Sequence, residues 1–331
     1  MGQFTESRGD RLKEKVWRDI DKSGIELEIK AAEVFRQTSG WAVSPIYNFV
    51  DLDSRKGREI DFWVNFEKEL EIPDYSLLFS VSVLVECKKI PGNAWIFFPA
   101  SKADAFGLFS YSDALGGGMR ANGFPNVFTN LLEHRVAYDT VSVHNKESVT
   151  DRKKSNGRTD NLYKGLVSLA KCLDERQKRD REGDKLYRQE TLDELEVNPE
   201  LMKKLMAKDG LSLFDSAGIN LLLLVFDGPI FIAGLGNREL TEAGCIRTSF
   251  GYQSSKYSLE NVPIDVCSIG HLPNYVKQLD AAVADFLSLA KGTEYNPGYG
   301  ERDYDKSKTW LENRRLGAYE NLSKWWKSGL S

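Results

Sequence analysis

Two strand-like stretches between Arg58 and Lys89 constrain the fold of this chain more than any other feature. Residues 58–65 and 82–89 alternate apolar and polar side chains and are rich in β-branched and aromatic residues, which is typical of half-buried strands. The charged segment between them, residues 67–76, contains Pro73 and favours a turn over a strand. The whole stretch therefore predicts an antiparallel hairpin.

The predicted hairpin gathers several charged side chains on one face. If it folds symmetrically about its turn, Asp61 lies opposite Glu86, and Glu59 lies opposite Lys88. Directly opposed carboxylates repel each other and destabilise a strand pair. A divalent cation removes this repulsion, and Mg²⁺ prefers oxygen ligands and retains waters for a phosphate substrate. A lone acid-x-Lys triplet is more often a solvated strand face, but the acid on the neighbouring strand and the apolar run before Glu86 favour a site.

These residues resemble the PD-(D/E)xK, or restriction-endonuclease-like, nuclease superfamily. Its core runs helix, three antiparallel strands, helix and a further strand, with an acid on the first helix, Asp on the second strand and Glu-x-Lys on the third. Asp61 matches the strand acid and Glu86-Cys87-Lys88 matches the Glu-x-Lys, whereas Pro73-Asp74 lies in the turn and is a decoy. The resemblance implies a metal-dependent endonuclease that hydrolyses phosphodiester bonds in DNA, with a role in restriction or phage defence.

The same resemblance implies roles for the matching residues. Asp61, Glu86 and the backbone carbonyl of Cys87 would hold Mg²⁺ or Mn²⁺, and the metal would stabilise the charge that develops on the phosphate. Lys88 would position the attacking water or help to deprotonate it. Glu28 would help to hold the metal, either directly or through water.

Glu28 is our choice for the acid on the first helix, because it lies at the edge of an apolar helical stripe. Glu26 and Glu33 are the alternatives. Glu26 has a competing explanation as the capping-box partner of Ser23, which is expected to cap this helix. The apolar stripe consists of Ile25, Ile29, Ala32 and Phe35.

Basic residues near the predicted site could hold a phosphate backbone, although a solvated loop explains those before the hairpin equally well. Aromatic residues between Trp95 and Tyr111 could stack on bases, but such residues more often form core. The basic residues expected to bind nucleic acid are Arg55, Lys56, Arg58, Lys89, Arg152, Lys153, Lys154, Arg158 and Lys164.

The predicted fold class is α/β, with a mixed central sheet flanked by helices in a restriction-endonuclease-like core. Residues 1–22 form an N-terminal helical arm, and residues 23–100 and 159–291 form the core. Residues 101–158 are an insertion after the third strand that is available for substrate binding, and residues 292–331 are a linker and a basic amphipathic helical tail. Within the core, helices are expected at 161–175 and 271–290 and strands at 41–49, 219–226, 230–233 and 264–269, with an extra strand at 134–144.

Composition limits the choice of function classes. With 41% hydrophobic and 28% charged residues, the 331-residue chain is an ordinary globular protein of one or two domains. The net charge of −4 gives no global attraction to nucleic acid, so DNA contact needs a local basic surface. The four cysteines and three histidines lack disulfide-framework or metal-ligand spacing. Without a leader or a long apolar run, the expected location is the cytoplasm, with no membrane partner.

Two other functions fit parts of the sequence. A catalytically silent subunit for nucleic-acid binding or assembly could keep the fold, but it would have no need for the mutually repelling Asp61 and Glu86. An RNA-cutting effector controlled by a regulatory protein partner is the other alternative, and a homo-oligomer is also compatible with the tail.

Overall fold

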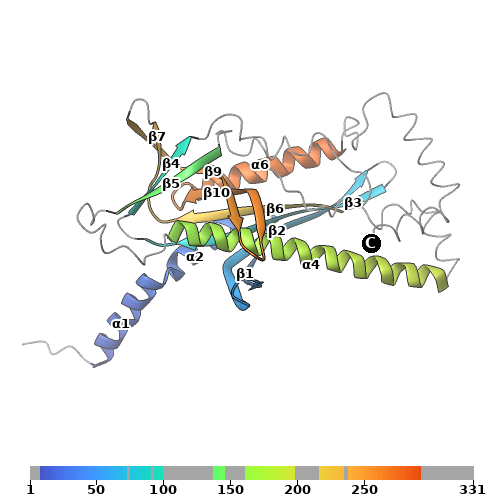
Figure 1. Cartoon of the computed structure of the whole chain (residues 1–331), viewed down its shortest axis with the longest axis horizontal. Coiled ribbons are helices and arrows are strands. Elements are labelled where there is room, and N and C mark those ends of the chain that lie inside the picture. Colours follow the sequence, from blue (N-terminus) through green and yellow to red (C-terminus); the bar gives the residue numbers. More distant parts are fainter. Residues whose placement is uncertain are drawn as a thin grey trace, which may run out of the picture.

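The computed structural model describes residues 8–72, 75–90, 93–99, 137–145, 161–197, 216–234 and 238–291. Its helices are α1 (Arg8–Ser23), α2 (Ile25–Arg36), α4 (Asn161–Val197) and α6 (Leu272–Lys291) (Figure 1). Its strands are β1 (Ala42–Asp51), β2 (Lys56–Ile72), β3 (Tyr75–Lys88), β4 (Asn93–Pro99), β5 (Ala137–Asn145), β6 (Ser216–Phe226), β7 (Ile230–Gly234), β8 (Glu239–Ala243), β9 (Cys245–Gln253) and β10 (Ser258–Ser268).

The described strands form one mixed ten-stranded sheet in the order β1-β2-β3-β6-β10-β9-β5-β4-β7-β8. β1, β2 and β3 are antiparallel neighbours, and β6 lies parallel between β3 and β10. The predicted strand at 219–226 is therefore central, and its apolar residues from Leu221 to Phe226 are all buried. A continuous apolar run is expected for a strand that is covered on both faces.

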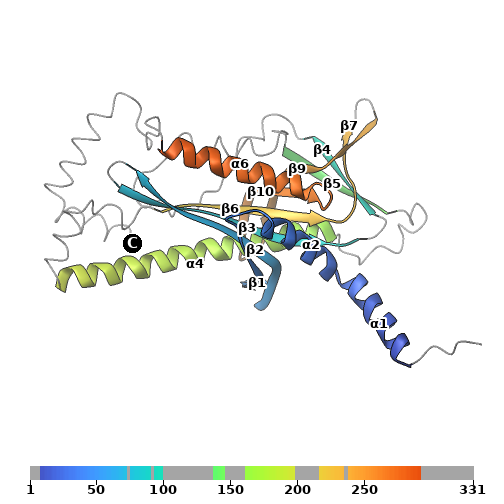
Figure 2. The same cartoon turned by 180° about the vertical axis from the view of Figure 1, so that it is seen from behind.

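Helices cover both faces of this part of the sheet (Figures 1 and 2). α2 and α6 pack on one face, where Leu223 and Val225 of β6 point. α4 packs on the other face with Leu222 and Leu224. The prediction of an α/β protein with a mixed sheet flanked by helices is confirmed at this level.

The register predicted for the central hairpin is confirmed, but its length is not. β2 pairs with β3 from Phe62–Val85 to Ile72–Tyr75, so the segment predicted as a turn is strand. Its acidic residues alternate with Leu70 and Ile72, and this two-residue period fits a strand. Only residues 73 and 74 separate β2 from β3, and they lie outside the described residues.

The start of α2 also differs from the prediction. Ser23 is the last residue of α1, and Gly24 caps α2 in the left-handed conformation with a φ of 84° and no side-chain cap bond. Glycine adopts this conformation without a Cβ clash. Glu26 is not a capping-box partner, because it forms ion pairs with Lys30 at 2.7 Å and Lys89 at 3.5 Å.

Several boundaries extend beyond the predicted ones. α4 continues through the mixed-charge run at 174–190, and β5 joins the main sheet between β9 and β4 although it belongs to the predicted insertion. β4, β8 and β9 were not predicted as strands. The predicted linker and tail at 292–331 lie outside the described residues.

A disulfide joins Cys245 of β9 to Cys267 of β10, which are paired across the two strands. The scattered spacing of the cysteines did not predict it, because β-sheet pairing brings together residues that are distant in the sequence. Among the described helices, none has both the length and the apolar character needed to cross a membrane.

Candidate active site

The predicted catalytic residues Glu28, Asp61, Glu86 and Lys88 come together at the end of β3, and we call these four residues the acid site. Asp61 Oδ2 accepts a hydrogen bond of 2.5 Å from the backbone N–H of Cys87. Lys88 Nζ donates to Glu86 Oε1 on its own strand, whereas the sequence had offered Glu59 as its partner. Glu28 reaches this group from α2 and interacts electrostatically with Asp61 and Lys88.

A local distortion of β1 and β2 positions Asp61. In β1, Ile46 has a φ of 53° and is omitted from the pairing between the two strands. Ile60 and Phe62 belong to the clusters on opposite faces of the sheet, although residues two apart on a regular strand share a face. Irregularities of this kind redirect side chains and are frequent near active sites. Asp61, at the point of the distortion, bonds Cys87 where the ladder of β2 and β3 ends.

Glu86 has an unsatisfied carboxylate in the part of the chain that the structure describes. The residue is 6% exposed, and its Oε2 is buried without a hydrogen-bond partner. Burial raises the pKa of Glu86 to about 7; Lys88 opposes the shift, and the negative charges of Asp61 and Glu28 add to it. Because buried carboxylate oxygens in folded proteins normally have partners, the unpartnered Oε2 makes this position a candidate for ligand binding.

The other two acids are also destabilised as anions. Burial raises the pKa of Asp61, although the Cys87 N–H and the Lys88 charge act in the opposite direction. Burial raises the pKa of Glu28 as well, and the neighbouring Asp61 contributes to that shift. Within the acid site, three carboxyl groups therefore share one ammonium group, and negative charge exceeds positive charge.

α4 approaches the acid site through Gly165. A Cβ at this position would lie 2.8 Å from Leu224 Cδ1 and 3.5 Å from Lys88 Cε. Glycine thus allows α4 to pack closely on β6 and beside the Lys88 stem. We did not single out Gly165 from the sequence, although a glycine within an apolar helical pattern was an available signal. Lys164 precedes it and is exposed.

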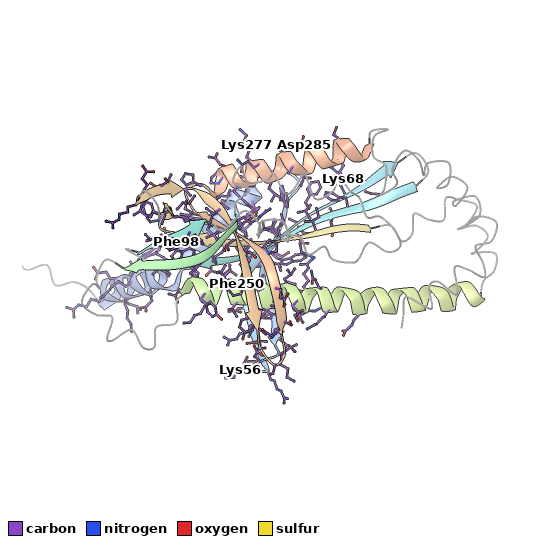
Figure 3. All side chains as sticks on the ribbon, turned by 45° about the horizontal axis from the view of Figure 1, so that its top comes forward. Lys56, Lys68, Phe98, Phe250, Lys277 and Asp285 are labelled. Carbon is purple, nitrogen blue, oxygen red and sulfur yellow. A yellow bond between two sulfur atoms is a disulfide. The ribbon has the colours of Figure 1, made fainter. Side chains whose placement is uncertain are left out.

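The predicted phosphate-binding residues are divided among several places. Arg55, Lys56 and Arg58 are exposed where β1 turns into β2, and Lys56 lies at the far end of the molecule from Lys277 in Figure 3. Lys89 pairs with Glu26 instead of lying open. Arg152, Lys153, Lys154 and Arg158 lie outside the described residues.

Two of the three aromatic residues of β4, Trp95 and Phe97, belong to the core. Trp95 and Phe97 are fully buried, and Trp95 stacks on Phe226 with a centroid distance of 3.8 Å. These two side chains are not available to stack on bases.

A second charged group, centred on Lys171 of α4, holds the β1–β2 turn in place. Lys171 Nζ lies 2.9 Å from Asp51 Oδ1 and 2.7 Å from Asp53 Oδ2. Asp53 also accepts hydrogen bonds from Tyr252 and Ser254 on the β9–β10 side, at 2.7 Å and 2.6 Å. We call these five residues the lysine cluster. It ties the turn that bears Arg55 and Lys56 to α4 and β9.

Ionisation is favoured in the lysine cluster. The bond from Lys171, supported by those from Ser254 and Tyr252, lowers the pKa of Asp53 to about 2. Burial opposes ionisation of Asp51, but bonds from Lys171 and Ser54 outweigh it and lower the pKa of Asp51. Sequence reasoning missed this group, because Asp51 and Lys171 are 120 positions apart.

The acid site fits a metal with few protein ligands. Within the described ranges, no three or more His, Cys, Asp or Glu side chains lie close enough together to hold a metal ion. Asp61, Glu86 Oε2 and the Cys87 carbonyl are oxygen donors, and Mg²⁺ binds through one or two carboxylates while keeping several waters.

Comparisons with protein-family models, with curated proteins and with solved structures found no significant match.

Proposed function

We propose that this chain is a Mg²⁺- or Mn²⁺-dependent endonuclease with a restriction-endonuclease-like core, which hydrolyses phosphodiester bonds in DNA. The observation that carries the proposal is the buried Glu86 carboxylate, whose Oε2 has no partner among the described residues, beside Asp61 and Lys88. Functional sites retain such unsatisfied and pKa-perturbed groups, because a ligand completes them.

The order of elements supports the proposed core. Helix α2, the antiparallel strands β1, β2 and β3, helix α4 and the parallel strand β6 follow the family's order of helix, three strands, helix and strand. Glu28 is on the helix, Asp61 on the second strand and Glu86-x-Lys88 on the third. β5 lies within the predicted insertion at 101–158, whereas β4 ends before it.

The acid site and the neighbouring Cys87 carbonyl supply three roles in the proposed reaction. Asp61, Glu86 and the Cys87 carbonyl would hold the metal, which would supply a positive charge to the phosphate. Lys88 holds its ammonium group at the end of β3, where it orients the attacking water and donates to a phosphate oxygen. Glu28 accepts a hydrogen bond from a water at the edge of the site.

The β1–β2 turn is the proposed contact with the DNA backbone. Arg55, Lys56 and Arg58 are exposed there, and Lys171 pairs with the acids Asp51 and Asp53 of the same turn, with Arg58 at 3.8 Å from Asp51. The chain as a whole carries a net charge of −4, so DNA binding requires a local positive surface, and these basic residues provide one.

The test is a cleavage assay with supercoiled plasmid, linear duplex, single-stranded DNA and RNA, each with Mg²⁺, Mn²⁺, Ca²⁺ or EDTA. We expect cleavage of DNA with Mg²⁺ or Mn²⁺, and none with Ca²⁺ or EDTA. DNA binding without cleavage under any condition would instead indicate a silent binding subunit. Cleavage of RNA alone would indicate an RNA-cutting effector, and undiminished cleavage in excess chelator would exclude the metal mechanism.

A further inference from the structure

α1 carries an apolar stripe that is not covered by the rest of the described chain. Leu12, Val16 and Trp17 are 62%, 48% and 65% exposed, and Ile20 continues the stripe at helical spacing. The helix leaves α2 at Gly24 and projects from the body of the molecule (Figures 1 and 2). Exposed apolar patches of a few hundred Å² commonly mark protein interaction sites.

The length of α1 also argues for a partner. A helix of 16 residues is only slightly longer than the isolated helices that are marginal in water, and most helices in proteins depend on the packing of their apolar side. In the described structure the neighbour of α1 is α2, which leaves the Leu12 side of α1 facing solvent. A second helix on the stripe would supply the missing packing.

The charges beside the stripe identify that second helix. At about 3.6 residues per turn, Lys15 and Asp19 lie on one flank of the line through Leu12, Val16 and Ile20, and Lys13 and Trp17 lie on the other. We propose that α1 of one chain pairs antiparallel with α1 of a second copy, with Val16 near the two-fold axis. This inference does not depend on the proposed nuclease function.

An antiparallel arrangement makes these flanks complementary. The two-fold axis is perpendicular to both helices, so each flank meets the same flank of the partner helix. Arg11 and Lys15 then lie on either side of the Asp19 position of the second copy, which outweighs the approach of Lys15 to its own counterpart, and Lys13 lies beside the Trp17 position. The first contact is an ion pair and the second is a cation–π contact, and symmetry repeats both.

A parallel arrangement would be unfavourable. Opposite flanks would then meet at the same height, which places Lys15 beside the Lys13 position of the second copy. Like charges at this separation repel each other. The sequence of α1 therefore selects the antiparallel pair.

The interface is small, so its affinity should be modest. Stable protein interfaces bury about 800 Å² on each partner, and one 16-residue helix offers less. We expect wild-type protein to pass from monomer to dimer between roughly 1 and 100 µM, the range of affinities for small transient interfaces. Sedimentation velocity of the full chain over this range measures the transition directly.

Charge-swap variants test the arrangement. Lys15→Glu and Asp19→Lys each place like charges together in the homodimer and should weaken self-association by at least about tenfold. An equimolar mixture of the two variants should dimerise again, since the carboxylate introduced at position 15 of one chain then meets the ammonium group introduced at position 19 of the other. This recovery distinguishes a specific interface from simple loss of the helix.

Leu240→Asp is the matched control, because Leu240 is also 60% exposed but lies on β8. It should leave the dimerisation unchanged, whereas Val16→Asp should abolish it. A wild-type chain that remains monomeric at a concentration of about 100 µM would overturn the proposal and indicate that a different molecule covers the stripe. Dimerisation that neither Val16→Asp nor the charge variants alter would also overturn it.

Discussion

The acid site and the lysine cluster each combine carboxylates with one lysine, but they differ in how well the carboxylates are satisfied. In the lysine cluster, Lys171 bonds both acids, and Tyr252 and Ser254 bond Asp53 as well. In the acid site, Glu86 Oε2 is buried without a partner among the described residues. The pKa of Asp53 is accordingly lowered, and the pKa of Glu86 is raised.

This difference separates a structural role from a functional one. A group that serves stability has its charges paired in the folded chain, and removing one partner is costly. A group that awaits a ligand keeps repulsion and unsatisfied oxygen atoms, at some cost in stability, until the ligand is present. The two groups should therefore respond to substitution in opposite directions.

The largest stability effect is expected in the lysine cluster. Lys171→Met leaves the buried Asp51 with only the more distant Arg58, whose Nε lies 3.8 Å from Oδ2, and should lower the free energy of unfolding by about 3–5 kcal/mol. Lys178→Met is the control, since Lys178 pairs with Asp174 on the surface of the same helix and should cost at most about 0.5 kcal/mol. Urea denaturation measures both, and equal effects would remove the distinction between buried and exposed pairs.

Substitution in the acid site should instead raise the free energy of unfolding when no metal is present. Burial raises the pKa of Glu86 from 4.5 to about 7, so the stability associated with its protonated form is present below pH 4.5 and is lost as the pH rises through 7. In EDTA, Glu86→Gln should be more stable than wild type at about pH 8 by about 2–3 kcal/mol and nearly equal at about pH 4.5.

Glu69→Gln is the matched control, because Glu69 is exposed on the same hairpin. Its stability should follow that of wild type at both pH values. A Glu86→Gln protein that is less stable than wild type at the higher pH would show that Glu86 is structural.

Lys88 tests whether the single cation of the acid site serves the reaction. Lys88→Met should reduce the single-turnover cleavage rate by about 10²-fold, the usual effect of losing an acid–base or electrostatic group. Metal affinity should change far less, because Asp61 and Glu86 remain. Lys68→Met, on the exposed part of β2, should cleave normally. Cleavage by Lys88→Met within a few-fold of wild type would remove Lys88 from the reaction.

The smallest effect is expected at the turn that the lysine cluster holds. Replacing Arg55 and Lys56 with Gln should weaken DNA binding several-fold and reduce the salt dependence of binding by about 0.9 for each phosphate that the protein no longer touches. Lys277→Gln on α6 is the control at the opposite end of the molecule (Figure 3). Binding isotherms at several salt concentrations give the slope of the logarithm of the binding constant against the logarithm of salt concentration. Equal slopes for wild type, the Arg55 and Lys56 double variant and Lys277→Gln would exclude this part of the DNA interface.

The sequence predicted the acid site because its partners follow from one hairpin register. Symmetry about the turn placed Asp61 toward Glu86, and the observed Phe62–Val85 pair agrees with that register. The sequence did not reveal that the pairing of β1 with β2 is interrupted at Ile46 and Asp61, since a positive φ at isoleucine leaves no pattern in the sequence.

Long-range contacts account for most of what was missed. The lysine cluster and the Cys245–Cys267 disulfide depend on which strands become neighbours in a ten-stranded sheet. Local periodicity carries no information about these partners. The Gly24 cap is a different case, because the glycine after Ser23 was a visible signal, and we assigned the cap to Ser23 instead.

The most direct test of the central claim is single-turnover DNA cleavage by wild-type protein and by Glu86→Gln, each with Mg²⁺ and with EDTA. We predict that only wild-type protein with Mg²⁺ cleaves, that Glu86→Gln is slower by at least about 10²-fold, and that its fold is intact by circular dichroism. Equal cleavage by the two folded proteins, or equal cleavage with Mg²⁺ and with EDTA, would contradict the assignment of this site as a metal-dependent nuclease centre.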